Sequence, residues 1–138
     1  MRRLFLAVTV FLCLVGSALA DETTAISQAQ SAATAWLALT DAGQYGPSWD
    51  ATASLFQAAV TKAQWEAALK GARAPLGALK SRKVKTATFT RTMPGAPDGE
   101  YVVIQFDTQF EHKALAVETV TPRREQDGVW RVSGYFIK

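Results

Sequence analysis

Apolar residues in the first half of the chain recur at helical spacing. Between residues 25 and 40 they fall three, four and seven positions apart, with Gln28, Gln30 and Ser31 on the opposite side. The apolar positions of this stripe are Ala29, Ala32, Ala33, Trp36 and Leu37. The pattern predicts a first helix over residues 25–40, ended by the turn residues of segment 41–43.

The next segments predict two shorter elements and one longer helix. Pro47 can occupy the first turn of a short helix over residues 48–54, and residues 55–60 form an apolar stretch without clear periodicity. Thr61 and Gln64 have the spacing of a capping box, with Val60 and Trp65 at the positions of a hydrophobic staple. A helix over residues 62–72 is therefore expected.

From residue 83 onward the pattern changes to β-branched and aromatic residues with a period of two. This predicts four strands, over residues 83–91, 100–110, 114–121 and 129–137, separated by turns at 94–99, 111–113 and 126–128. Helices followed by an antiparallel meander indicate an α+β fold. We expect two to three N-terminal helices packed on one face of a curved four-stranded sheet.

Hairpin loops at Glu111-His112 and Asp127-Gly128 predict which strand residues share a face. The face expected to pack against the helices collects Val102, Ile104, Phe106, Leu115, Val117, Thr119, Trp130, Val132 and Phe136. The other face collects Tyr101, Val103, Gln105, Asp107, Glu118, Val120, Tyr135 and Ile137, with Gln105 beside Glu118. A one-residue slip, or a bulge near Pro122, would exchange the faces of a strand.

The first twenty residues have the organisation of a secretory signal. Arg2 and Arg3 precede an apolar run over residues 4–15, and Ala18-Leu19-Ala20 is a small-x-small cleavage site. We expect cleavage after Ala20, a single domain over residues 21–138, a periplasmic or secreted location and no stable membrane insertion. Cys13 would be removed, which leaves a mature domain without cysteine.

The composition excludes several classes of function. One His and one Cys cannot build a Cys/His zinc site or an iron–sulfur site, so no metal and no cofactor is expected. The chain has 15 basic and 12 acidic residues, and removal of the signal leaves 13 against 12. This balance does not favour a general nucleic-acid binder, and we interpret the basic cluster at Lys80, Arg82, Lys83 and Lys85 as the solvated start of a strand.

A set of short motifs resembles the secreted bacterial family known as domain of unknown function 4019 (DUF4019). The motifs are Trp36-Leu37-Ala38-Leu39, Asp41-Ala42-Gly43, Tyr45, Ser48-Trp49, Gln64-Trp65, Pro75-Leu76-Gly77, Ser81-Arg82, Pro97-Asp98-Gly99-Glu100-Tyr101, Gln105-Phe106-Asp107, Glu118-Thr119-Val120 and Trp130-Arg131-Val132-Ser133-Gly134-Tyr135. The resemblance implies a small exported bacterial protein and carries no catalytic residue with it. The layout is also similar to NTF2-like and cystatin-like cone folds, which host enzymes and binders alike.

Glu118 is the best candidate for acid/base chemistry. Burial near Val103, Gln105 and Tyr135 would raise the pKa of its carboxyl, as in ketosteroid-isomerase-type enzymes, with Tyr101 or Tyr135 as the second donor. The alternative is that Glu118 pairs with an arginine, either Arg124 or Arg131, or faces water. His112 is expected to be a solvated turn residue.

The aromatic residues divide into core and candidate binding positions. Trp36, Trp65 and Trp130 fall on apolar stripes and are expected in the core, whereas Trp49 is a candidate for the mouth of a pocket. Arg82 and Arg131 are candidates for an anionic ligand or, more simply, for ion pairs.

Three functions remain open. The first is a non-catalytic association module in which Tyr101, Val103, Val120, Tyr135 and Ile137 form a sheet face buried against a second copy or a partner. The second is a pocket for a small apolar ligand, with candidate lining residues Trp49, Tyr101, Gln105, Glu118, Arg131 and Tyr135. The third is a metal-free lyase, isomerase or hydrolase that uses Glu118. An enzyme is the less favoured class.

Overall fold

The computed structural model describes the backbone of residues 15–138 and the side chains from Asp21 onward. The helices are α1 (Val15–Asp41), α2 (Tyr45–Asp50), α3 (Ser54–Ala59) and α4 (Lys62–Arg73), followed by the short 3-10 helix η1 (Ala74–Leu76). The strands are β1 (Leu79–Thr90), β2 (Tyr101–Phe110), β3 (Lys113–Arg124) and β4 (Trp130–Ile137). The predicted signal segment, residues 1–20, lies outside the residues whose side chains are described, so its cleavage stays a prediction.

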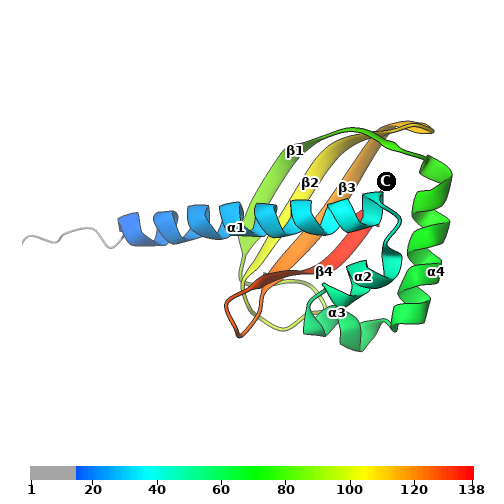
Figure 1. The fold of residues 1–138 in the computed structure, drawn as a ribbon. Helices are drawn as coiled ribbons and strands as arrows, with labels where there is room; N and C mark the ends of the chain where they lie inside the picture. The colour runs from blue at the N-terminus through cyan, green and yellow to red at the C-terminus, as the bar shows by residue number, and fades with distance from the viewer. Residues whose placement is uncertain (1–14) are drawn as a thin grey trace, which may run out of the picture.

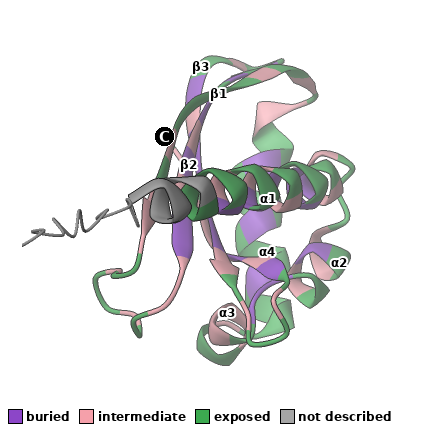
Figure 2. Ribbon diagram, turned by 90° about the vertical axis from the view of Figure 1, so that its left-hand side faces the viewer, coloured by how far each residue is buried: buried purple, intermediate pink, exposed green. Residues whose placement is uncertain are grey.

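The strands form an antiparallel sheet in the order β1-β2-β3-β4, and the helices lie on one of its faces (Figure 1). Seen close to edge-on, the sheet has α1, α2, α3 and α4 on one side, and none of the helices described for residues 15–138 lies on the other side (Figure 2). The predicted α+β layout is therefore confirmed. In the described part of the chain, no helix is both long enough and apolar enough to cross a membrane.

The helices follow the predicted stripes, with three differences. The short helix predicted over residues 48–54 is α2, which runs from Tyr45 to Asp50, and Ser54 is already the first residue of α3. Ala29, Ala33, Trp36 and Leu37 are buried on α1 as expected, but this helix begins at Val15, ten residues before the predicted start. Segment 55–60, predicted to be irregular, lies mostly in α3. A tertiary contact accounts for this helix, because the ring of Phe56 packs edge-on against Trp65 with a centroid distance of 5.0 Å.

The capping box that predicted α4 is confirmed. The Thr61 hydroxyl accepts a hydrogen bond from the Gln64 amide (3.2 Å), and the Gln64 side-chain oxygen accepts one from the Thr61 amide (3.1 Å). These two bonds satisfy amide groups that a helix start otherwise leaves without partners. The start of α4 is thus set by local sequence.

A bulge at the β2–β3 hairpin overturns the predicted faces of β3. Phe110 pairs with Lys113 across the expected two-residue loop, but Thr108 pairs with Ala116, which shifts the register by one residue. Phe106 consequently lies opposite Glu118 instead of Val117. Because side chains alternate along a strand, Ala116, Glu118 and Val120 face the helices, and Leu115, Val117 and Thr119 face the opposite side.

A second irregularity, between Val120 and Pro122, corrects the faces of β4. Trp130 and Val132 are buried on the helix side as predicted. Beyond the bulge Tyr135 also faces the helices, where it contacts Trp36 with a centroid distance of 5.1 Å. The prediction that Phe136 packs against the helices is wrong, because alternation places it on the uncovered face, where it is 51% exposed.

Gly77 allows the chain to turn from η1 into β1. Its φ is +73°, and a Cβ there would lie 2.9 Å from His112 Cδ2 and 3.0 Å from Glu111 Cβ. Gly95, in the β1–β2 loop, has φ +74°, but no heavy atom lies within 4 Å of the position that a Cβ would take there. The two glycines share the backbone constraint and differ in the space around them.

We expect Gly95→Ala to cost about 1–2 kcal/mol, the strain of a left-handed alanine. Gly77→Ala should cost about 1–3 kcal/mol more, because the new methyl group must also displace the 111–112 hairpin. Urea unfolding of both variants measures the difference. Equal losses would contradict the close approach of this hairpin to Gly77.

Candidate functional site

A carboxylate lies buried in the layer between the sheet and the helices. The side chain of Glu118 on β3 has 0% exposure. Its Oε1 accepts hydrogen bonds from Arg82 Nε and from Thr108 Oγ1, both at 2.7 Å, and its Oε2 accepts one from the Tyr135 hydroxyl. Each of the four strands therefore contributes one side chain to this cluster.

Arg82 connects the carboxylate of Glu118 to the end of α1. Its Nη1 donates to Asp41 Oδ2 at 2.7 Å, and its Nη2 donates to Asp41 Oδ1 at 2.9 Å. This two-pronged geometry uses both carboxylate oxygens of Asp41, while the remaining Nε serves Glu118. One guanidinium thus holds two carboxylates in place.

Arg73, at the end of α4, completes the group of charges. Its Nη2 donates to Asp41 Oδ1 (3.0 Å), and its Nη1 donates to the carbonyl of Gly77 (3.0 Å). The guanidinium also stacks on Phe110 at 4.2 Å from the ring centroid, and the side chain is only 3% exposed. We call Asp41, Arg73, Arg82 and Glu118 the buried charge network; its two positive charges balance its two negative charges.

The pKa shifts of Asp41 and Arg82 favour the charged form of each side chain. Burial raises the pKa of Asp41, but the hydrogen bonds and charges of Arg82 and Arg73 outweigh this effect and hold it below the usual range. Burial likewise lowers the pKa of Arg82, while Asp41 and Glu118 raise it more, so the guanidinium stays charged. Burial and the neighbouring Glu118 carboxylate raise the pKa of Tyr135, which keeps its hydroxyl a donor.

This geometry corrects several predictions about Glu118. Its arginine partner is Arg82 instead of Arg124 or Arg131, and Gln105 lies on the other face of the sheet, opposite Thr119. Only Tyr135 of the predicted neighbours contacts it. Because the carboxylate is sealed from solvent and both oxygens are occupied, the arrangement is that of a structural ion pair.

The other candidate residues lie elsewhere. Arg131 pairs with Asp127 on the surface (2.9 Å), and Arg124 pairs with Glu100 (3.1 Å). His112 lies in the β2–β3 hairpin loop, as predicted, with a largely exposed side chain. Among the described residues, no group of three His, Cys, Asp or Glu side chains could hold a metal ion.

Aromatic side chains occupy the space in which the sequence predicted a ligand pocket. Trp36 and Trp65 lie 6.1 Å apart and donate to the carbonyl and the hydroxyl of Ser48, at 2.8 Å and 2.9 Å. Trp49 donates its indole N–H to the carbonyl of Val60 (2.8 Å), so it finds the expected partner inside the protein. Of the predicted lining residues, Arg131 borders one of three hollows on the described surface, and none of the three hollows is lined by Trp49, Glu118 or Tyr135.

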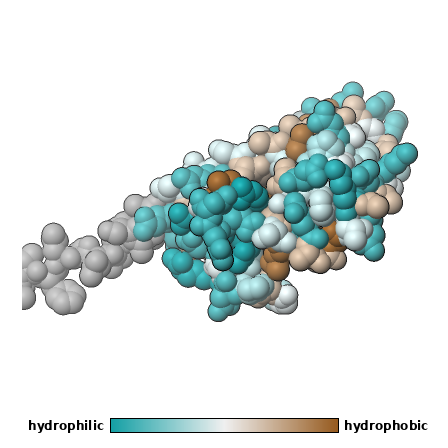
Figure 3. All heavy atoms as spheres, turned by 60° about the horizontal axis from the view of Figure 1, so that its bottom comes forward, coloured by the Kyte–Doolittle hydropathy of each residue, from teal (hydrophilic) through white to brown (hydrophobic). Residues whose placement is uncertain are grey.

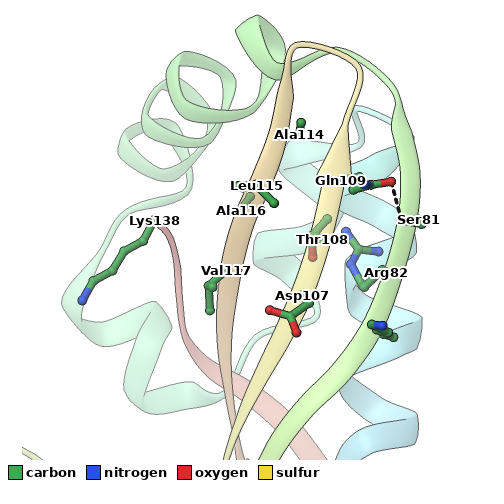
Figure 4. A pocket seen from close by; sticks show the side chains of 11 residues that line it. Ser81, Arg82, Asp107, Thr108, Gln109, Ala114, Leu115, Ala116, Val117 and Lys138 are labelled. Atoms are coloured by element: carbon green, nitrogen blue, oxygen red, sulfur yellow. Dashed lines mark hydrogen bonds between the residues drawn. The ribbon is translucent and has the colours of Figure 1, made fainter.

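The uncovered face of the sheet is the other candidate site. Leu115 is 87% exposed and Phe136 is 51% exposed on this face, and Val103 and Val117 are half-buried. A hollow of about 840 Å³ lies against β1, β2 and β3, and Leu115, Val117 and Asp107 surround it (Figure 4). We call Val103, Leu115, Val117 and Phe136 the apolar face residues.

The predicted interface set matches this face only in part. Val103 lies on this face, and Tyr101 belongs to it by alternation. Tyr101 is nevertheless only 1% exposed, and its hydroxyl donates a hydrogen bond to the carbonyl of Pro97 in the β1–β2 loop (2.6 Å). Val120, Tyr135 and Ile137 alternate toward the helices, so the prediction that they stand on an open face is wrong. The two bulges turn the side chains of these three residues toward the helices and those of Leu115 and Phe136 toward the uncovered face.

Asp41, Arg73 and Thr108 were not predicted from the sequence, although a signal for the first two exists. Asp41 follows Leu37 by four positions on α1, and Arg73 follows Leu69 by four positions on α4. An ionisable residue that continues an apolar stripe is carried toward the core and needs a partner there. The basic cluster at 80–85 was also misinterpreted at one position, because Arg82 points inward while Lys80, Lys83 and Lys85 are exposed.

We expect Arg82→Met to lower the free energy of unfolding by about 3–5 kcal/mol, because the variant leaves Glu118 as an uncompensated buried charge. Arg131→Met is the matched control: it removes an arginine with the same two-pronged bond to an aspartate, but on the surface. The control should unfold at the wild-type urea concentration. Equal destabilisation of the two variants would contradict a special role for the buried network.

The lowered pKa of Asp41 predicts a pH dependence. Above about pH 4 the carboxylate is charged in both the folded and unfolded states and its bonds to the arginines stabilise the fold; this contribution is lost as the pH falls through the lowered pKa. Asp41→Asn lacks this titration. Urea unfolding between about pH 7 and pH 3, a window that includes the ordinary pKa of an aspartate, should therefore show a smaller loss of unfolding free energy in the variant than in the wild type. The same loss in both proteins would contradict the lowered pKa of Asp41.

Comparison with known proteins gives one match. A family model described as protein of unknown function (DUF4019) matches residues 32–135, from the middle of α1 to the end of β4. No curated protein and no solved structure matches the chain, so the similarity to NTF2-like and cystatin-like folds stays a prediction. The match includes the aromatic layer and the buried charge network and ends one residue before Phe136, and the chain belongs to the DUF4019 family.

Proposed function

We propose that this protein is a non-catalytic association module, exported from the cytoplasm, that binds a protein partner through the uncovered face of its sheet. The observation that carries the proposal is the exposure of Leu115 (87%) and Phe136 (51%) on a face that no helix covers. Large apolar side chains gathered on one exposed face are typical of an interaction surface.

The interior supports association over catalysis. Glu118, the strongest acid/base candidate, is sealed from solvent and bound by Arg82, Thr108 and Tyr135. A general acid or base must reach the proton that it transfers, and a group without solvent-exposed surface does not. The interior network therefore connects the sheet to α1 and α4, and we assign recognition to the outer face.

The edges of the sheet favour contact through the face instead of strand addition. On β1, exposed lysines at positions 80, 83 and 85 and a register irregularity between Val84 and Thr86 are features that discourage pairing with another chain. On β4, the carbonyl of Val132 already accepts a hydrogen bond from the Ala53 amide (2.8 Å).

The side of the molecule seen in Figure 3 offers less to an apolar partner. The side of the molecule around α3 and the neighbouring loops shows mainly polar residues, with separate apolar spots between them (Figure 3). Single exposed apolar residues are normal on a protein surface and need no partner. The apolar face residues are distinguished by lying together on one face.

Site-specific photocrosslinking in the producing cell tests the proposal. A photoreactive phenylalanine analogue is placed at Leu115, at Phe136 and, as a control, at Val84, which is similarly exposed (46%) but lies opposite Phe106 on the helix side of β1. We expect protein adducts from positions 115 and 136 and none from position 84. No adduct at 115 and 136, or equal adducts at all three positions, would refute the uncovered face as the binding surface.

A further inference from the structure

We infer, on the basis of the proposed function, that the partner of the uncovered face is a second copy of this chain. The two copies are related by a two-fold axis, and Phe136 of each copy occupies the hollow beside Leu115 and Val117 of the other. The shape, size and charge of the face each support this inference.

The face carries both halves of a self-complementary contact. Phe136 projects from β4, and the hollow of about 840 Å³ lies on the same side of the sheet with Leu115, Val117 and Lys138 among its lining residues. The two features are neighbours, because Phe136 pairs with Thr119, two residues along β3 from Val117. In a two-fold contact residue i meets residue j twice, so one projection and one hollow per copy fill each other.

The size of the face matches a small dimer interface. Strands rise about 3.3 Å per residue and lie about 4.8 Å apart, so a four-stranded face of this length covers roughly 600 Å². Two such faces would together bury roughly 1,200 Å², which is the lower limit for a specific protein interface. Such an area predicts a reversible dimer instead of an obligate one.

The face carries charges of both signs: Asp107 lies 4.0 Å from Lys85, and Lys83 and Lys138 line the same hollow as Asp107. Lys83 lies opposite Asp107 across β1 and β2, and neither side chain is buried. A two-fold axis can bring the lysine of one copy to the aspartate of the other, whereas a nucleic acid or an anionic membrane would call for positive charge alone. Polar pairs also line the β1 side, where Ser81 donates to Gln109 (3.1 Å) and Thr86 donates to Gln105 (3.2 Å).

Sedimentation velocity of the purified protein tests the inference. An interface of this small area is expected to have a dissociation constant in the micromolar range. As the protein concentration rises from about 1 to about 100 μM, the sedimenting mass should therefore increase from that of one chain toward that of two. Phe136→Asp and Leu115→Asp should each raise the dissociation constant at least about tenfold, because each buries a charge in the contact. Val84→Asp is the matched control and should dimerise as the wild type does.

All three aspartate variants change exposed side chains, and circular dichroism and urea unfolding are the checks that each variant folds. A mass of one chain at all concentrations would overturn the inference. So would a loss of dimer in Val84→Asp equal to that in Phe136→Asp, because Val84 lies outside the face.

Cysteine pairing tests the proposed arrangement independently. On a Cys13→Ser background, Leu115→Cys and Phe136→Cys chains are oxidised alone and as an equal mixture. The mixture should form disulfide-linked dimers faster than either variant alone, because the two-fold contact brings position 136 of one copy to position 115 of the other. Faster pairing of either variant with itself would overturn the arrangement.

The photocrosslinking experiment separates this inference from the proposed function. Adducts at 115 and 136 with a different protein, together with a monomer in sedimentation, refute the second copy and leave the association module supported. Absence of both adducts and dimers refutes both. Adducts with the mass of two chains support both.

Discussion

Two carboxylates and two guanidinium groups share the layer between the sheet and the helices, and removal of Arg82 or Asp41 would leave another buried charge without its ion-pair partner. Arg82 bonds to both Glu118 and Asp41, and Arg73 bonds to Asp41. An unpaired charge in such a place is costly, so the ends of α1 and α4 are fixed relative to β1 and β3. The helices are therefore positioned on the sheet by charge pairing as well as by apolar packing.

The bulge at the β2–β3 hairpin produces both candidate sites at once. It shifts β3 by one residue, which turns Glu118 toward Arg82 and, by the same alternation, turns Leu115 and Val117 outward. The second bulge does the same on β4, where Tyr135 reaches Glu118 and Phe136 becomes exposed. A regular ladder would have buried the apolar side chains and exposed the carboxylate. The same two register shifts thus bury these polar side chains and expose these apolar ones.

On β3 and β4, some polar side chains therefore face the helices and some apolar side chains face outward. The inside is closed, because every oxygen of Glu118 and Asp41 accepts hydrogen bonds from neighbouring side chains. The outer face carries Leu115 and Phe136 as exposed apolar side chains, near one end of β3 and near the end of β4. Glu118, the acid/base candidate of the sequence, lines none of the three described hollows, whereas Leu115 and Val117 line one of them on the uncovered face.

The sequence by itself determined the elements whose signals are local. The capping box at Thr61, the apolar stripe of α1 and the loop at Glu111-His112 specified α4, α1 and the β2–β3 hairpin, and with them the α+β layout. Only the tertiary structure decided the faces of β3 and β4 and the partner of Glu118. A bulge is one extra residue in a strand and has no distinct sequence signature, yet it moves every side chain beyond it to the opposite face of the sheet. Asp41 and Arg82 lie 41 positions apart in sequence, and only the packing of α1 on the sheet brings their charges together.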